Sequence, residues 1–191
     1  ETKLEQSVTG VVIDSRKVEE GFLFVPIKGA RVDGHTFIPQ VMEKGALCTL
    51  TEEPLGEVTY PYILVQSCEQ ALKDLAEHYR KALDINPKST DAMFNLGNAL
   101  LMQQKANEAM EQYQSVSKIE KDKDKLAQIY HNMGVIMQSS KQYAQCIEAY
   151  KESLRNNPKD DETRYNLALA QKLLKDQEQQ NRNQEQQEQQ Q

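Results

Sequence analysis

Two short segments near the start of the 191-residue chain carry residue types that bind anions. One places a serine beside an arginine, and the other is a glycine-bearing loop with basic residues and a histidine: Ser15, Arg16, Lys28, Gly29, Arg31, Asp33, Gly34 and His35. The N–H groups of such a loop, together with Arg, Lys and His side chains, can cradle a diphosphate. A purely structural interpretation stays open, in which Asp14 and Arg16 pair to brace a turn and the glycines supply only backbone angles.

Sequence spacing gives no set of side chains for catalysis or metal binding. The three histidines are far apart and lack acidic or cysteine companions at ligand spacing: His35, His78 and His131. The three cysteines form no C-x-x-C pair, which argues against a disulfide framework and against a zinc site. We therefore expect no catalytic residue, no metal, no cofactor and no enzyme activity.

The composition indicates helices with broad solvated faces, because only 38% of the residues are hydrophobic. A formal net charge of -6 disfavours a general nucleic-acid surface, which needs a basic footprint. No run approaches the roughly 18 apolar residues that span a bilayer. The sequence starts at Glu1 without a methionine or a signal-like segment, so we expect an engineered or processed chain and leave its compartment open.

The first 70 residues predict a small domain of the α+β or α/β class. Four short β-rich runs are bounded by turn residues and lie at 11–13, 22–25, 46–50 and 62–65. A helical pattern over 36–44 separates the second run from the third and stops at Gly45. With a second helix after the last run, the predicted order is strand, strand, helix, strand, strand, helix.

From about residue 76 the apolar residues take helical spacing, and a longer internal repeat is visible. A small residue and a tyrosine recur in register: Tyr79 and Tyr113 are 34 residues apart, as are Gly134 and Ala168. A period of about 34 residues with helix–turn–helix units is the signature of tetratricopeptide repeats. We expect the small residues to let paired helices approach closely, and the tyrosines to fill the space between one repeat and the next.

Six helices are predicted in an all-α solenoid, followed by a glutamine-rich tail. Their ranges are 68–85, 90–103, 106–120, 124–138, 142–156 and 160–178. The middle four make two full repeats and the last is a capping helix, so the array covers 86–175. Gly97 and Gly134 are 37 residues apart, which predicts a looser charged turn at 120–125. The tail, 176–191, has no apolar stripe and is expected to be frayed or disordered.

The front of the chain, residues 1–70, resembles the amino-terminal domain of Mur ligases. The motifs that carry this resemblance are D-S-R at 14–16, G-F-L-F at 21–24 and K-G-A-R-V-D-G-H at 28–35. The similarity covers roughly 5–76 and is strongest to the type that adds D-alanyl-D-alanine to UDP-N-acetylmuramoyl-tripeptide. In that family the domain holds the UDP end of the substrate, so the resemblance implies ligand contacts from Ser15, Arg16 and the 28–35 loop.

The resemblance does not extend to the ligase machinery. Mur ligases need an ATP-binding domain with a glycine-rich phosphate loop, and no Gly-x-x-x-x-Gly-Lys-Ser/Thr sequence occurs in this chain. We therefore expect no ligase activity from the chain alone, and at most weak binding of a UDP-muramoyl-peptide.

The Mur-type and repeat patterns overlap in one helix with no linker between them. The sequence A-L-K-D-L-A at 71–76 fits the end of a Mur ligase amino-terminal domain, and the residues from Tyr79 to Pro87 fit the second helix of a repeat. We interpret the chain as a chimera whose halves share the helix 68–85. The repeat half is also similar to bacterial aerotolerance proteins of the Bat type. These resemblances imply the cytoplasm for the front half and allow the periplasm for the repeat half.

The first helices of the repeats are expected to line a concave partner-binding face. Its predicted residues are Asp91, Phe94, Asn98, Leu101, Met102, Gln128, His131, Val135 and Gln138. Repeats that clamp a peptide's terminal carboxylate use Lys or Arg with Asn, and this face has Asn98 and His131 without the lysines. A mixed apolar and amide groove for an extended or helical peptide is favoured over such a clamp. A structural spacer is the remaining alternative.

These observations predict a protein-interaction scaffold that carries a non-catalytic Mur ligase-like domain. One alternative is a fragment of a peptidoglycan-precursor ligase, inactive without its ATP-binding domain, and another is an engineered fusion with no joint function. The expected partners are a protein or peptide in the groove and a UDP-muramoyl-peptide at the front domain, with no nucleic acid and no membrane span. Self-association into a homo-oligomer is a further expectation, because so few repeats bury little surface.

Overall fold

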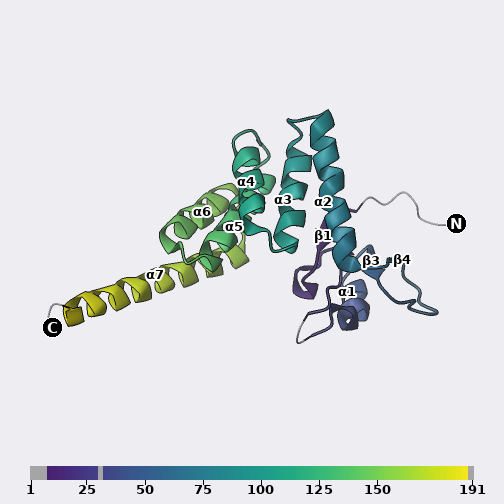
Figure 1. Cartoon of the computed structure of the whole chain (residues 1–191), viewed down its shortest axis with the longest axis horizontal. Coiled ribbons are helices and arrows are strands. Elements are labelled where there is room, and N and C mark those ends of the chain that lie inside the picture. The colour runs from purple at the N-terminus through teal and green to yellow at the C-terminus, as the bar shows by residue number, and fades with distance from the viewer. Residues whose placement is uncertain (1–7, 30–31, 189–191) are drawn as a thin grey trace. The chain divides into compact units, whose positions relative to one another are not determined.

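The computed structural model describes residues 8–29 and 32–188, and it divides into two compact units. The first unit comprises Glu1–Lys81 and Ala99–Gln104, and the second comprises Ala82–Asn98 and Lys105–Gln191. All the strands belong to the front of the chain, and helices follow one another through the rest (Figure 1).

The first unit is built on a four-stranded parallel sheet. Its strands lie in sequence order across the sheet: β1 (Gly10–Val12), β2 (Phe22–Phe24), β3 (Cys48–Thr51) and β4 (Tyr62–Leu64). The connection from β2 to β3 contains helix α1 (Ile38–Glu43), and β4 leads into α2 (Cys68–Ile85). The predicted order of strands and helices is confirmed, and the parallel pairing makes this unit an α/β fold.

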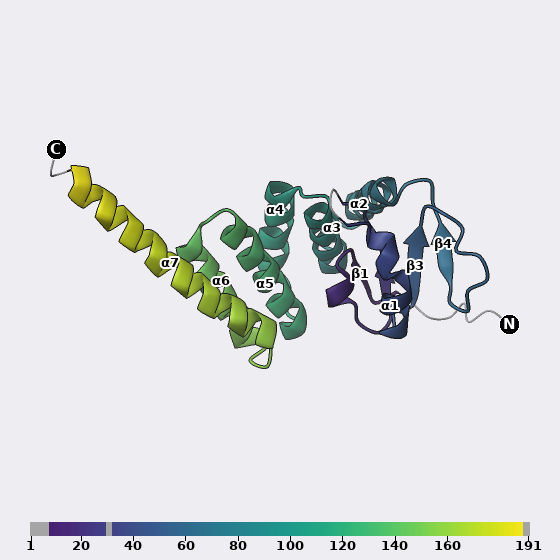
Figure 2. The same ribbon diagram turned by 90° about the horizontal axis from the view of Figure 1, so that it is seen from below.

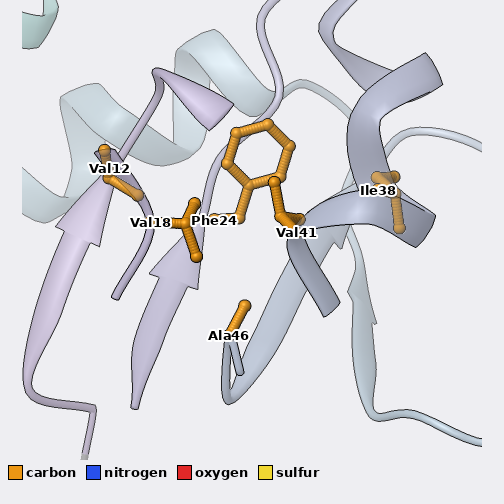
Figure 3. Packing of buried hydrophobic residues seen from close by; sticks show 6 residues of the cluster. All are labelled: Val12, Val18, Phe24, Ile38, Val41 and Ala46. Atoms are coloured by element: carbon orange, nitrogen blue, oxygen red, sulfur yellow. The ribbon is translucent and has the colours of Figure 1, made fainter. Parts of the chain in front are cut away.

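Successive strand residues point to opposite faces of the sheet, and each face packs against its own buried cluster. On one face, buried residues of the strands, α1 and the connecting loops form a cluster (Figure 3): Val12, Val18, Phe24, Ile38, Val41 and Ala46. On the other face, Leu23 packs against a cluster that contains Leu50 of β3 and Leu72 of α2. The sheet therefore lies between α1 and α2.

The helix predicted at 36–44 is a 3-10 turn, η2 (Gly34–Phe37), that runs into the six-residue α1. Pro39 lies in the first turn of α1, where its missing N–H removes no helical hydrogen bond. Gly45 follows with φ of 102°, a left-handed conformation that glycine adopts without strain. The predicted glycine stop is confirmed.

The second unit consists of helices that pack on their sequence neighbours. They are α3 (Thr90–Met102), whose last residues belong to the first unit, α4 (Ala106–Ser117), α5 (Lys123–Ser139), α6 (Tyr143–Asn156) and α7 (Asp161–Glu188). Helix α4 packs on α5, α5 on α6, and α6 on α7 (Figure 2). All the predicted helices are present, and α2 has the bounds predicted for the shared helix.

In each repeat a glycine of the first helix faces a tyrosine of the second. A Cβ atom on Gly97 would lie 2.7 Å from Cε1 of Tyr113, and Gly134 stands in the same relation to Tyr150. Both tyrosines are fully buried. The small residues therefore permit the predicted close approach. Each tyrosine ring also reaches toward the following unit: the Tyr113 hydroxyl accepts a hydrogen bond from Asn132 of the next repeat, and Tyr150 belongs to a buried cluster that contains Ala170 of α7.

The connection between α4 and α5, which is three residues longer than the 34-residue period predicts, is held by two carboxylates. Glu120 accepts hydrogen bonds from the N–H groups of Lys121 and Asp122, at 2.7 and 2.9 Å, and Asp122 caps the start of α5. These bonds organise the turn that the sequence predicts to be looser.

The backbone of α7 stays helical as far as Glu188, well into the segment where the sequence predicts a frayed or disordered tail. Glutamine and glutamate are good helix formers, which explains a helix without an apolar stripe. The last three positions of that predicted tail, 189–191, lie outside the described residues.

Candidate functional sites

The first candidate segment is a 3-10 turn, η1 (Ser15–Lys17), capped by Asp14. The Asp14 carboxylate accepts hydrogen bonds from the Arg16 N–H at 3.0 Å and from the Arg16 guanidinium at 2.9 and 2.6 Å. The side-chain hydrogen bond from Arg16 is the largest cause that lowers the pKa of Asp14. The turn-bracing pair of the structural interpretation is therefore present, although the Arg16 side chain is 86% exposed.

The glycine-bearing loop uses its glycine N–H groups internally. Gly29 donates to the carbonyl of Val32 at 3.0 Å, and Gly34 donates to the carbonyl of Ile27 at 3.1 Å. A Cβ atom on Gly34 would lie 2.8 Å from the Ile27 backbone, so this position needs glycine for close approach. An anion at this loop would thus be held by side chains and not by these two N–H groups.

Among the described residues of this loop, Lys28 is the only lysine or arginine. It is 67% exposed, and its Nζ lies 3.8 Å from the carboxylate of Asp33. Arg31, which the resemblance places beside it, lies outside the described residues. Whether Ser15, Arg16 and this loop contact one ligand stays a prediction.

Asp33 fixes the orientation of His35. Its Oδ1 accepts from the His35 N–H at 3.0 Å and lies 2.7 Å from the ring Nδ1. The backbone hydrogen bond of His35, followed by the side-chain one, lowers the pKa of Asp33. Because a carboxylate only accepts, Nδ1 carries the hydrogen, and the neutral ring keeps Nε2 as an acceptor. That Nε2 lies 3.9 Å from Sγ of Cys68.

His35 also meets Glu52, so a histidine, a carboxylate and a cysteine come together. Their ligand atoms lie within 4.8 Å of one another, the only such group in residues 8–29 and 32–188. Burial raises the pKa of the Cys68 thiol to about 11, and the charges of Glu52 and Asp33 add to this effect. Sequence spacing misses the group, because its members are brought together by the sheet.

The residues predicted for the partner-binding face differ widely in exposure. Two are exposed, Asp91 and Gln128, and His131 is buried; the rest are half-buried: Phe94, Asn98, Leu101, Met102, Val135 and Gln138. Asp91 pairs with Lys125 at the start of α5. Met102 packs against the Leu50 and Leu72 cluster of the first unit, so core packing accounts for this side chain.

Asn98 belongs to a hydrogen-bonded network between neighbouring repeats. The Tyr113 hydroxyl donates to Oδ1 of Asn98 at 2.7 Å. Asn132 Nδ2 donates to the same oxygen at 3.1 Å and to the Tyr113 oxygen at 3.2 Å. Burial raises the pKa of Tyr113, so its hydroxyl stays protonated as the donor. The network joins α3, α4 and α5 at the predicted face.

His131 is buried where α5 meets the first turn of α7. Its Nδ1 lies 2.6 Å from Oγ1 of Thr163, its Nε2 lies 3.8 Å from Glu162, and its ring is tilted against Tyr150. The Thr163 hydroxyl donates to Asp160 at 2.6 Å, so Nδ1 is the donor to Thr163. The structure therefore places His131 in a packed junction and not on an open groove.

Two different families match the two halves of the chain. Residues 7–80 match the Mur ligase family, catalytic domain, and residues 78–111 and 127–160 match tetratricopeptide repeats. The chain thus joins a Mur ligase-type N-terminal domain to two tetratricopeptide repeats, as predicted. The two matches meet at 78–80, within α2, and this overlap fits the interpretation of a chimera that shares one helix.

The Mur-type half is similar to ligases with different specificities. It is 44% identical over 71 residues to a UDP-N-acetylmuramyl-tripeptide synthetase of Roseiflexus sp., covering 36% of this chain and 14% of that protein. It is 40% identical over 82 residues to the UDP-N-acetylmuramoyl-tripeptide--D-alanyl-D-alanine ligase of Bacillus subtilis, covering 41% and 18%. The chain therefore spans less than a fifth of the length of these relatives.

Solved structures are similar to parts of the chain. MurF from Acinetobacter baumannii is 29% identical with a TM-score of 0.37, covering 39% of this chain and 16% of that one. The MamA protein is 21% identical with a TM-score of 0.49, covering 53% and 54%. None of the helices described for this chain is both long and apolar enough to cross a membrane.

Proposed function

We propose that the chain is a non-catalytic scaffold that binds a protein or peptide through its tetratricopeptide repeats. The observation that supports this function most directly is the pair of repeat matches on helices whose Gly97–Tyr113 and Gly134–Tyr150 contacts build stacked helix pairs. Stacked repeats of this kind present extended surfaces for partner binding.

The chemistry of the face favours a peptide with apolar side chains and a polar backbone. Phe94 supplies apolar area, and Gln128 supplies an exposed amide on the first helix of the next repeat. Lys125, the basic residue nearby, is already paired with Asp91. A terminal carboxylate therefore finds no dedicated cation among these residues.

The test is selection of binding peptides from a random display library with the full chain as bait. The variant Gln128→Arg should lower the affinity for the selected peptides about tenfold or more, because it places a long charged side chain on the face. Gln145→Arg, on an exposed position of α6, is the matched control and should bind normally. If both variants bind the selected peptides with equal affinity, the peptides do not bind at the face that contains Gln128. Light scattering on the same samples tests self-association.

The absence of enzyme activity is part of the same proposal. The Mur-type match covers only the front of the chain, and the sequence contains no glycine-rich phosphate loop of the G-x-x-x-x-G-K-S/T kind. The full chain, given ATP, magnesium, UDP-muramoyl-tripeptide and D-alanyl-D-alanine, should release no phosphate above a protein-free blank. Saturable phosphate release that follows the purified chain would contradict the proposal.

A second function, weak binding of a UDP-muramoyl-peptide, is favoured by the match over 7–80 and by the exposed Lys28. Titration with this nucleotide should raise the unfolding temperature of the full chain in a saturable way. Lys28→Ala should reduce the rise in unfolding temperature. Lys73→Ala, at an exposed lysine of α2, should leave this rise unchanged. No shift at millimolar ligand would rule this function out and leave the scaffold proposal intact.

A further inference from the structure

Three potential metal ligands lie together at the carboxyl edge of the sheet. His35 lies in η2, after β2; Glu52 directly follows β3; and Cys68 opens α2, after β4. The carboxyl ends of parallel strands meet at one edge, which brings side chains from distant parts of the sequence to the same place. One nitrogen, one oxygen and one sulfur atom thereby lie within 4.8 Å of one another.

The separation of the atoms suits a small cation. Zinc bonds of about 2.0–2.1 Å to nitrogen and about 2.3 Å to sulfur place a tetrahedral N···S pair about 3.5 Å apart. The observed distance from His35 Nε2 to Cys68 Sγ is 3.9 Å, so a small movement of either side chain closes the site. As a hydrogen bond to sulfur, 3.9 Å is near the outer limit.

The histidine is already oriented as a ligand. Asp33 accepts from Nδ1 at 2.7 Å, which leaves the lone pair of Nε2 directed at the cluster. Histidines that bind metal commonly donate their second ring N–H to a carboxylate in this way, since the bond fixes the ring and raises its basicity. Asp33 is thus a positioning residue and not a ligand.

The other two side chains are also held in place. Glu52 accepts a hydrogen bond from the backbone N–H of Cys68 at 2.8 Å through Oε1. A carboxylate has two oxygens with four acceptor positions, so this bond leaves capacity for a cation. Cys68 is 1% exposed, which keeps the thiol away from bulk oxidants.

We propose that His35, Glu52 and Cys68 form a binding site for a divalent transition-metal ion, with zinc as the best fit to one nitrogen, one oxygen and one sulfur ligand. The thiol releases its proton to solvent when the metal binds. Three protein ligands leave a fourth position for water or another small ligand. The site is independent of the repeats and of the scaffold function.

Cobalt is the probe, because a Co²⁺–thiolate bond gives a near-ultraviolet charge-transfer band. The full chain, stripped with a chelator and kept reduced with a non-thiol reductant, should develop this band up to one equivalent of Co²⁺. Zn²⁺ should then displace the cobalt and raise the unfolding temperature. No band and no zinc-dependent stabilisation would overturn the proposal, and would leave Glu52 as a helix cap and Cys68 as a core residue.

Variants assign the ligands. Cys68→Ser and Cys68→Ala should each abolish the band, while Cys48→Ser, a cysteine of the same unit outside the cluster, should retain it. Asp33→Asn should keep the band but weaken metal binding about 10–100-fold, the usual effect of losing a partner of a histidine ligand. Circular dichroism checks that each variant is folded. A band that survives in both Cys68 variants, or that Cys48→Ser removes, would overturn the assignment.

Discussion

Gly97 of α3 and Tyr113 of α4 are in such close contact that a Cβ atom on the glycine would lie 2.7 Å from Cε1 of the ring. Side chains almost never approach so closely, and the fully buried ring has no room to move aside. Gly134 and Tyr150 stand in the same relation in the second repeat. The spacing of the two helices in each repeat therefore depends on a missing side chain.

Gly97→Ala should lower the free energy of unfolding by about 1–2 kcal/mol, because overpacking costs about 1–3 kcal/mol and the helix propensity of alanine returns up to about 1 kcal/mol. Urea unfolding followed by far-ultraviolet circular dichroism measures the change. In a Tyr113→Leu background the same substitution should cost less or should stabilise, since the ring is gone. An equal loss in both backgrounds would contradict the contact.

The amide and tyrosine network predicts a second stability change. Tyr113→Phe removes the donor to Asn98 and the acceptor for Asn132, so it should destabilise the repeats by about 1 kcal/mol. A double-mutant cycle with Asn132→Ala should show a coupling of about 0.5 kcal/mol or more. Tyr165→Phe, on a side chain that is 69% exposed, is the control and should change little. Additive effects of the two network substitutions would argue against the network.

Much of the fold was predictable, because its signals are local and periodic. The alternation of Val11 and Val12 sends one side chain to each face of the sheet, and the recurring glycine and tyrosine mark the repeats. What local signals do not give is the partner of each side chain. The sequence predicts that the tyrosine rings fill the space between repeats, and only the coordinates show that Tyr113 also faces Gly97 within its own repeat.

The candidate sites were less predictable than the fold. The residue types of the 28–35 loop suggested an anion cradle, yet the N–H groups of Gly29 and Gly34 both bond to the loop's own carbonyls. By sequence spacing His35 is isolated, because Glu52 and Cys68 are distant in sequence, and only the convergence of parallel strands brings the three together. His131 fitted a groove position by spacing, but the first turn of α7 covers it.

The turns within the two repeats predict a stabilising substitution. Gln104 and Lys141 occupy equivalent positions and both have left-handed backbones, with φ of 61° and 59°. Left-handed conformations cost a residue with a Cβ atom about 1–2 kcal/mol, and glycine avoids this cost. Lys141→Gly should therefore stabilise the repeats by about 0.5–1 kcal/mol in urea unfolding. Lys141→Ala, which keeps the Cβ atom, should not stabilise them, and a gain equal to that of glycine would contradict the backbone argument.

The cap of α7 predicts how stability depends on pH. Asp160 accepts hydrogen bonds from the N–H and the hydroxyl of Thr163, at 3.0 and 2.6 Å. Partial burial alone raises the pKa of Asp160, but these bonds and the Coulombic effect of His131 lower it below the ordinary value of 3.8. A carboxyl whose pKa is lower in the folded chain contributes stability above its unfolded pKa and loses that contribution as the pH falls through its folded pKa.

Asp160→Asn keeps a good capping side chain and removes only the charge. The variant should be less stable than the parent by about 0.3–1 kcal/mol at neutral pH, the usual value of a negative charge at a helix start, and the difference should vanish in strong acid. Asp161→Asn, whose carboxylate is 89% exposed, is the control and should show a smaller difference across the same range. A gap between parent and Asp160→Asn that persists unchanged below the folded pKa would show that the cap works without its charge.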